Sequence, residues 1–139
     1  MDEEKTAVAK RCLDGSYGNT MSFPECVKTL ATTGFEGYLV DYRQNSRIYY
    51  LPDGETLSLK NPHDVGTIEA EFDQAAVAEA IKWAQGNSPD YSYMEFNRKV
   101  TSYGCAGYMV SFIGRRVVYF GRTAETHIEH FPAKMSLQS

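Results

Sequence analysis

The 139-residue sequence lacks an apolar run long enough to cross a membrane. It also lacks a secretory signal, because the chain begins with acidic residues where a signal peptide would be basic and then apolar. Its three cysteines, Cys12, Cys26 and Cys105, are odd in number and show no metal-binding spacing, which is typical of reduced thiols. We therefore expect a cytoplasmic protein with no membrane partner.

An excess of positive charge is missing as well. The chain has 14 basic against 18 acidic residues, a net charge of −4, so nothing global attracts it to nucleic acid. Several aromatic and arginine side chains of the predicted strands could form a stacking platform for single-stranded nucleic acid, but such residues more often pack against helices. These residues are Tyr38, Arg47, Tyr49, Tyr50, Tyr108, Arg116 and Tyr119. The acidic balance favours packing, and we do not expect nucleic-acid binding.

Metal and thiol signatures are also sparse, with neither an HExxH motif nor paired CxxC motifs present. His127 and Glu129 stand two residues apart, but zinc needs at least three protein ligands. The residues that could add a third ligand, His63 or Cys105, are distant in sequence. Cys105 follows a predicted helix C-terminus, where the helix dipole disfavours a thiolate. We therefore expect no metal, no cofactor and no catalytic cysteine.

An internal repeat is the strongest positive signal. Residues 22–42 align with residues 92–112 at a constant offset of 70. The identical pairs are Ser22/Ser92, Glu25/Glu95, Gly34/Gly104, Gly37/Gly107, Tyr38/Tyr108 and Val40/Val110. Unrelated segments of this length share about one identity at typical residue frequencies. The alignment therefore predicts an internal duplication.

Each repeat reads as two helices followed by strands rich in aromatic and β-branched residues. Ser22 and Ser92 each stand three residues before a glutamate, as in a capping box, and Asp73 is a third expected helix cap. We predict repeat one at about 1–59, a linker at about 60–72 with a possible strand over 67–72, and repeat two at about 73–131. The expected product is one α+β domain, a duplicated ααβββ unit whose mainly antiparallel sheet packs against helices. A cleft is expected at the seam between the repeats.

Three segments carry a family resemblance: GCAGYMVSFIGRRVVYFGRTAETHIEHFP from Gly104, MSFPECVKTLATTGFEGYLVDY from Met21 and YYLPDGE from Tyr49. Together they resemble the YbcV-like family of small bacterial and prophage-encoded proteins, over nearly the whole chain. The resemblance implies no catalytic residues. Some members of that family carry a phage envelope protein label, which implies a phage-associated structural or interaction role as one alternative.

The richest polar cluster lies in the second repeat. Its members are Arg115, Arg116, Tyr119, Arg122, Glu125, His127, Glu129 and His130. On an extended strand over 123–131, Glu125, His127 and Glu129 share one face, and His130 lies on the other. At the offset of 70, His127 and Glu129 match Leu57 and Leu59 in the first repeat. A half-buried face that is apolar in one repeat and polar in the other predicts a site.

The leading hypothesis is a non-enzymatic binding domain. In this hypothesis the cluster lines a polar cleft that binds a small anionic ligand or a protein segment. The alternative is a hydrolase or lyase with His127 as general base, oriented by Glu129, and with arginines holding the substrate. A plain salt-bridge network on a solvated sheet face also fits the same residues. A homodimer remains open, since an open sheet leaves edges that a second copy can cover.

Overall fold

The computed structural model describes residues 1–86, 88–132 and 135. Two helices followed by three strands occur twice along the chain. The first half contains α1 (Glu3–Tyr17), α2 (Phe23–Thr33), β1 (Gly37–Asp41), β2 (Ser46–Tyr50) and β3 (Thr56–Lys60). The second half contains α3 (Gln74–Gln85), α4 (Tyr93–Ser102), β4 (Cys105–Ser111), β5 (Arg116–Gly121) and β6 (Thr126–His130). The predicted α+β class is confirmed.

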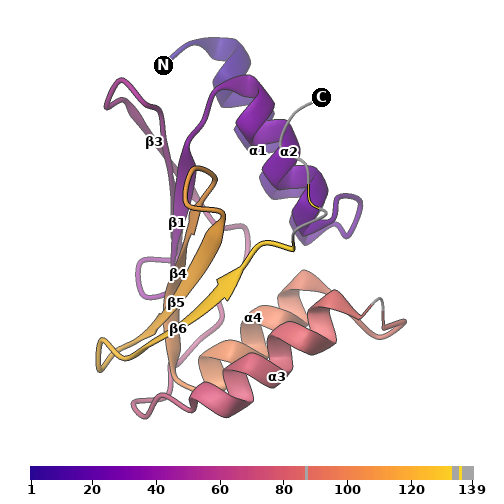
Figure 1. Ribbon diagram of the computed structural model, residues 1–139, viewed down its shortest axis with the longest axis vertical. Helices are drawn as coiled ribbons and strands as arrows, with labels where there is room; N and C mark the ends of the chain where they lie inside the picture. The colour runs from indigo at the N-terminus through magenta and orange to yellow at the C-terminus, as the bar shows by residue number, and fades with distance from the viewer. Residues whose placement is uncertain (87, 133–134, 136–139) are drawn as a thin grey trace.

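All six strands form one sheet in the order β3-β2-β1-β4-β5-β6, and every neighbouring pair is antiparallel. The two halves meet at the centre of the sheet, where β1 pairs with β4. Both helix pairs lie on the same side of the sheet, with α1 and α2 over one end and α3 and α4 over the other (Figure 1). The sheet therefore has an inner face under the helices and an outer face without them.

Local capping explains where the helices begin. The Ser22 hydroxyl accepts a hydrogen bond from the Glu25 amide, and the Glu25 carboxylate accepts one from the Ser22 amide, which completes the predicted capping box. The side chains of Asp73 and Ser92 cap α3 and α4 by accepting backbone amides three residues on. These predicted helix starts are confirmed.

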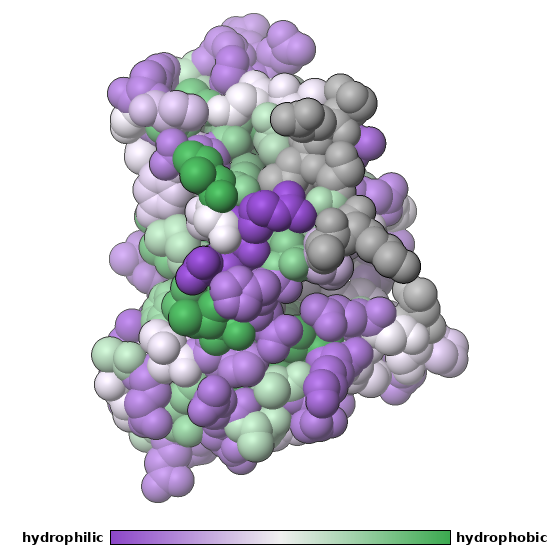
Figure 2. Space-filling view, in the orientation of Figure 1, coloured by the Kyte–Doolittle hydropathy of each residue, from purple (hydrophilic) through white to green (hydrophobic). Residues whose placement is uncertain are grey.

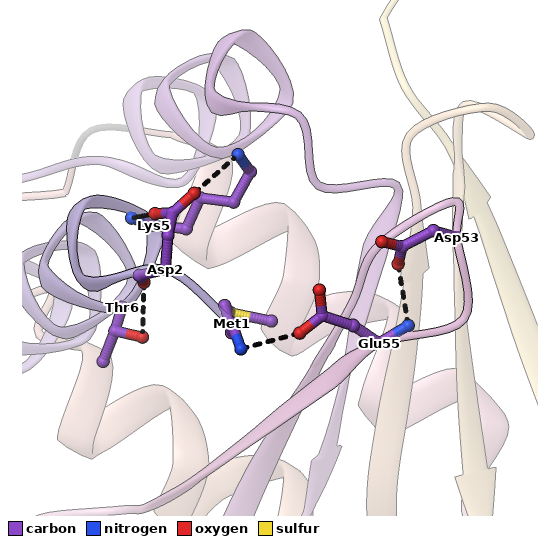
Figure 3. A network of polar contacts seen from close by, with 6 residues as sticks. All are labelled: Met1, Asp2, Lys5, Thr6, Asp53 and Glu55. Atoms are coloured by element: carbon purple, nitrogen blue, oxygen red, sulfur yellow. Dashed lines mark hydrogen bonds and ion pairs between the residues drawn. The ribbon is translucent and has the colours of Figure 1, made fainter.

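The start of α1 is attached to the sheet through the turn between β2 and β3 (Figure 3). Asp2 caps the helix by accepting the Lys5 amide at 2.7 Å, and its second oxygen lies 3.2 Å from the Lys5 ammonium. The Met1 amine donates to the Glu55 carboxylate at 2.7 Å, which raises the pKa of that amine. This network places α1 over the first half of the sheet.

Strand register follows the offset of 70 throughout the sheet. The pairs between β1 and β2 recur 70 residues later between β4 and β5, and those between β2 and β3 recur between β5 and β6. At the centre, Leu39 of β1 pairs with Met109 of β4, the residue 70 positions further along the chain. The Leu39–Met109 pair therefore lies where an approximate twofold axis crosses the sheet.

Two glycines explain how closely β1 and β4 approach each other. A Cβ atom at Gly37 would lie 2.4 Å from the Val110 carbonyl oxygen, and one at Gly107 would lie 2.3 Å from the Val40 carbonyl oxygen. Real Cβ atoms do not approach a carbonyl oxygen this closely. Both positions therefore require glycine for the same reason.

Two predicted strand boundaries need correction. The possible strand over 67–72 is wrong: this part of the chain has no strand, and the Glu69 amide donates instead to the Thr101 carbonyl at the end of α4. The last strand is β6, Thr126–His130, which is shorter than the predicted 123–131. The reason is a turn in which Ala124 has a φ of 65°, a left-handed conformation that no strand accommodates.

The outer face carries one line of apolar side chains across five strands. Ile48, Leu39, Met109, Val118 and Ile128 are successive cross-strand partners. Met109 is 36% exposed and Ile128 is 44% exposed. Figure 2 shows the molecule in the orientation of Figure 1, and on this side apolar residues form small separate groups among hydrophilic ones.

Candidate functional site

A cavity of about 800 Å³ lies between the inner face of the sheet and the helices, a size typical of small-molecule sites. Its walls come from both halves: the loop between α1 and α2, the facing ends of α3 and α4, and strands β1, β2, β4, β5 and β6. Most of the large side chains that line it are aromatic. These are Phe23, Tyr38, Tyr91, Tyr93, Phe96, Tyr108, Tyr119 and Phe131.

Arg47 is the only lysine or arginine among the described residues of this wall. It leaves β2 on the inner face and is 4% exposed. Its guanidinium donates a hydrogen bond to the Tyr93 hydroxyl, and its carbon atom Cζ lies 5.2 Å from the centre of the Tyr38 ring and 5.5 Å from that of Tyr93. Two aromatic faces thus hold the cation in place.

The charge of Arg47 has no partner in the part of the chain that the structure describes. No carboxylate of these residues pairs with its guanidinium. Its Nε and the nearby Tyr49 hydroxyl are both buried without a hydrogen-bond partner. Burial by itself would lower the pKa of Arg47, but the surrounding tyrosines, Tyr93 first, raise that pKa well above its usual range. The guanidinium is therefore charged, and a charge without an ionic partner away from water carries a desolvation cost. The cavity wall therefore carries an incompletely satisfied cation.

The tyrosines around Arg47 do not supply the missing negative charge. Burial raises the pKa of Tyr38 and of Tyr108 well above its usual range, although the nearby Arg47 opposes the shift. Burial also raises the pKa of Tyr49 to about 12. These hydroxyls are therefore uncharged at neutral pH. The Tyr93 and Tyr108 hydroxyls are hydrogen-bonded to each other beside the guanidinium and serve as polar contacts.

A carboxylate lines the opposite side of the cavity. Glu129 of β6 lies 2.6 Å from His127, between Oε2 and Nε2, so the predicted pairing of these residues is present. The other ring nitrogen of His127 lies 3.2 Å from the Gln74 amide nitrogen. The His127 side chain is 13% exposed, and both of its nitrogens are engaged. A general base at His127 would first have to break one of these contacts.

The strand β6 alternates as predicted: His127 and Glu129 face the helices, and Thr126, Ile128 and His130 are exposed. His130 nevertheless contributes to the rim of the cavity, and Tyr119 of β5 lies in its wall.

The other five residues of the predicted cluster do not line the cavity: His127, whose contacts are given above, and Arg115, Arg116, Arg122 and Glu125. Arg115 donates to the Met135 carbonyl at 2.7 Å and Arg122 to the Ile68 carbonyl at 3.2 Å. Arg116 is exposed, and its Nε donates to the Gly114 carbonyl at 3.2 Å. Glu125 is exposed in the turn before β6. The expected arginine clamp is therefore absent from the described part of this cavity, because these side chains bind nearby backbone or face solvent.

Sequence reasoning placed Arg47 only among the possible stacking residues and missed its role in the cavity. The signal was nevertheless available, because Arg47 is an inward position of an alternating strand and matches Val117 at the offset of 70. Val117 also lines the cavity. Where the first half has a long cationic side chain, the second half has a short apolar one.

Thiols and metal ligands give no second site. Burial raises the pKa of the Cys105 thiol to about 12, so it is protonated at neutral pH. Cys26 lines the cavity, and a hydrogen bond with the Cys12 thiol lowers the pKa of its own thiol. Its side chain is nevertheless only 4% exposed, and the thiol donates to the Cys12 carbonyl at 3.6 Å. Within residues 1–86, 88–132 and 135, no three histidine, cysteine or acidic side chains are grouped as a metal site would need.

No known family model matches the chain, and no curated protein matches it either. The resemblance to the YbcV-like family therefore stays a prediction. None of the described helices has the length and apolar character needed to span a bilayer.

Proposed function

We propose that the protein is a binding domain that holds a small organic anion in the cavity between the helix pairs, with Arg47 as the anchor. The observation that carries this proposal is the burial of Arg47 in the cavity wall with an unpartnered Nε and no carboxylate partner among the described residues. A cation kept in such a position lowers the stability of the empty protein, which is typical of binding residues.

Binding would follow from pairing this charge. An anionic oxygen of the ligand would accept a hydrogen bond from the guanidinium of Arg47, and charge-assisted bonds of this kind are the strong ones. The hydroxyls of Tyr93 and Tyr108 lie beside the guanidinium and offer further polar contacts. The aromatic walls would cover the apolar part of the ligand.

Thermal-shift titration tests this proposal with the sodium salts of acetate, benzoate, phosphate and phenyl phosphate. At least one anion is expected to raise the melting temperature of the wild type saturably. Arg47→Met should abolish that shift, whereas Arg116→Met, which changes an exposed arginine of the adjacent half, should retain it. The proposal fails if no anion stabilises the wild type, or if Arg47→Met responds in the same way.

The predicted second-half cluster is retained in this proposal only in part. Tyr119, Glu129 and His130 stay as cavity residues, and His127 stays only as the partner of Glu129. The remaining members, Arg115, Arg116, Arg122 and Glu125, no longer belong to the ligand site. No observation favours the hydrolase or lyase alternative, because the contacts of His127 occupy both ring nitrogens. The phage-associated role likewise has no structural observation in its favour. The homodimer stays a prediction that rests on the open sheet, which has β3 and β6 at its edges.

We also propose that the chain arose by internal duplication. Support comes from the element order, from the strand register that repeats at an offset of 70, and from the central pairing of Leu39 with Met109. Gly37 and Gly107 add a physical argument, since each lets the opposite strand approach to the same distance.

A further inference from the structure

We infer that the ligand is a monocarboxylate with a flat, apolar body, an inference that rests on the proposed function of the same cavity. Three features of the wall carry it: the balance of charges, the arrangement of aromatic rings, and the short side chain at Val117.

The charge balance favours a single negative charge on the ligand. Against the one cation, Arg47, the described wall carries two carboxylates, Glu25 and Glu129. Hydrogen bonds from the Ser22 amide lower the pKa of Glu25, which keeps it ionised at neutral pH. A carboxylate would neutralise Arg47, whereas a phosphate monoester brings a second negative charge that no further described cation of the wall offsets.

The aromatic rings favour a flat body. Tyr93 and Phe96 are nearly parallel, with an angle of 15° between the ring planes and centroids 6.3 Å apart. Tyr119 meets Phe96 edge to face at 6.5 Å. All three rings line the cavity, so the body of a ligand there would contact a wall of aromatic rings, which favours a flat apolar group.

The position of the body follows from comparing the two halves. Arg47 extends over the inner face of the first half, where its guanidinium reaches the rings of Tyr38 and Tyr93. The matching position in the second half is Val117, a much shorter side chain that also lines the cavity. We therefore place the carboxylate at Arg47 and the ring over Val117, toward Phe131.

Isothermal titration at pH 8 with three matched compounds tests this inference: 2-naphthoate, 2-naphthyl phosphate and 2-naphthamide. The carboxylate is expected to bind at least tenfold more tightly than the dianionic phosphate or the neutral amide. Arg47→Met should remove this preference. The ligand class is overturned if the phosphate binds as tightly as the carboxylate and both are lost in Arg47→Met, and the proposed function then stands. Both fall if none of the three compounds binds.

Two variants test the charge balance and the position of the ring separately. Glu129→Gln removes one carboxylate from the wall and should improve phosphate binding at least threefold more than carboxylate binding. Val117→Phe fills the space assigned to the ring and should weaken 2-naphthoate at least tenfold, whereas the effect on acetate should stay within threefold. An unchanged phosphate-to-carboxylate ratio in Glu129→Gln, or an undiminished affinity for 2-naphthoate in Val117→Phe, would contradict the corresponding step.

Discussion

Positions 70 residues apart agree at the centre of the sheet and differ at inner-face positions toward its two ends. Gly37 and Gly107 agree because a carbonyl oxygen of the neighbouring strand lies so close to each that a Cβ atom would clash with it. Tyr38 and Tyr108 agree as large buried side chains of the inner face. Where the backbone or the core restricts the residue, the two halves therefore carry the same one.

The differences concentrate polar chemistry on opposite sides of the cavity. The first half has Arg47 where the second has Val117, and the second half has Glu129 where the first has Leu59. The same two-layer framework thus holds a cation in one half and a carboxylate in the other. The comparison teaches that an approximately twofold fold can build an asymmetric site by changing a few inner-face residues.

Replacing either central glycine tests the agreement of the halves and should have the largest effect on stability. Gly37→Ala and Gly107→Ala each place a Cβ within 2.4 Å of a carbonyl oxygen, which forces β1 and β4 apart. We expect each to lower the free energy of unfolding by about 3 kcal/mol, or the melting temperature by about 10 °C. Gly86→Ala, whose Cβ would lie 3.4 Å from its nearest neighbour, is the control. A Cβ at Gly107 would also lie 2.7 Å from the Phe120 ring, so its loss is expected to be at least that of Gly37→Ala. A loss at either glycine no larger than that of Gly86→Ala would break the comparison.

Alkaline unfolding tests the shared tyrosine core. Burial raises the pKa of Tyr49 to about 12, against about 10 in the unfolded chain. Above pH 10 the unfolded state loses this proton while the folded state keeps it, so stability is full below pH 10 and falls as the pH rises to 12. Tyr49 alone should contribute a loss of about 3 kcal/mol. Urea unfolding at pH 8 to 11.5 measures the loss, which Tyr49→Phe should reduce; a pH-independent stability would contradict it.

Arg47→Met tests the largest difference between the halves. It replaces a buried, unpaired cation by an apolar side chain of similar length, as Val117 is apolar in the second half. The ligand-free protein should become more stable by about 2 kcal/mol, because the desolvation cost disappears. Chemical denaturation with urea measures the change, and Arg116→Met should stay within about 0.5 kcal/mol of the wild type. A loss of more than 1 kcal/mol in Arg47→Met would mean that Arg47 stabilises the fold.

The His127–Glu129 pair gives the smallest expected effect. The double variant His127→Leu/Glu129→Leu introduces the leucines of the first half, and its free energy of unfolding should stay within about 1 kcal/mol of the wild type. His127→Leu alone should be less stable than the double variant, since Glu129 then loses its partner. Urea unfolding of the three proteins decides this, and a double variant that is the least stable would contradict it.

Much of the fold was predictable from the sequence because its signals are local. Ser22, Asp73 and Ser92 mark helix starts by capping, and the offset of 70 predicts two copies of the same element order. The strand predicted over 67–72 failed because the Glu69 amide donates to the Thr101 carbonyl at the end of α4, a contact that no local pattern records.

The candidate site was predictable only in part. The alternation of β6 correctly gave the inward face of His127 and Glu129. The expected roles of Arg115 and Arg122 depended on where long side chains extend, and backbone carbonyls of distant segments accept their hydrogen bonds. Arg47 was passed over because its burial beneath α4 depends on how the helices pack over the sheet.

The most direct test of the account is the NMR signal of the Arg47 Nε–H group, assigned by its loss in Arg47→Met and followed during titration with 2-naphthoate. This proton is expected to shift saturably during the titration, because the guanidinium of Arg47 gains a carboxylate acceptor. A signal that stays in place while 2-naphthoate binds would show that the anion lies elsewhere and would contradict the central claim.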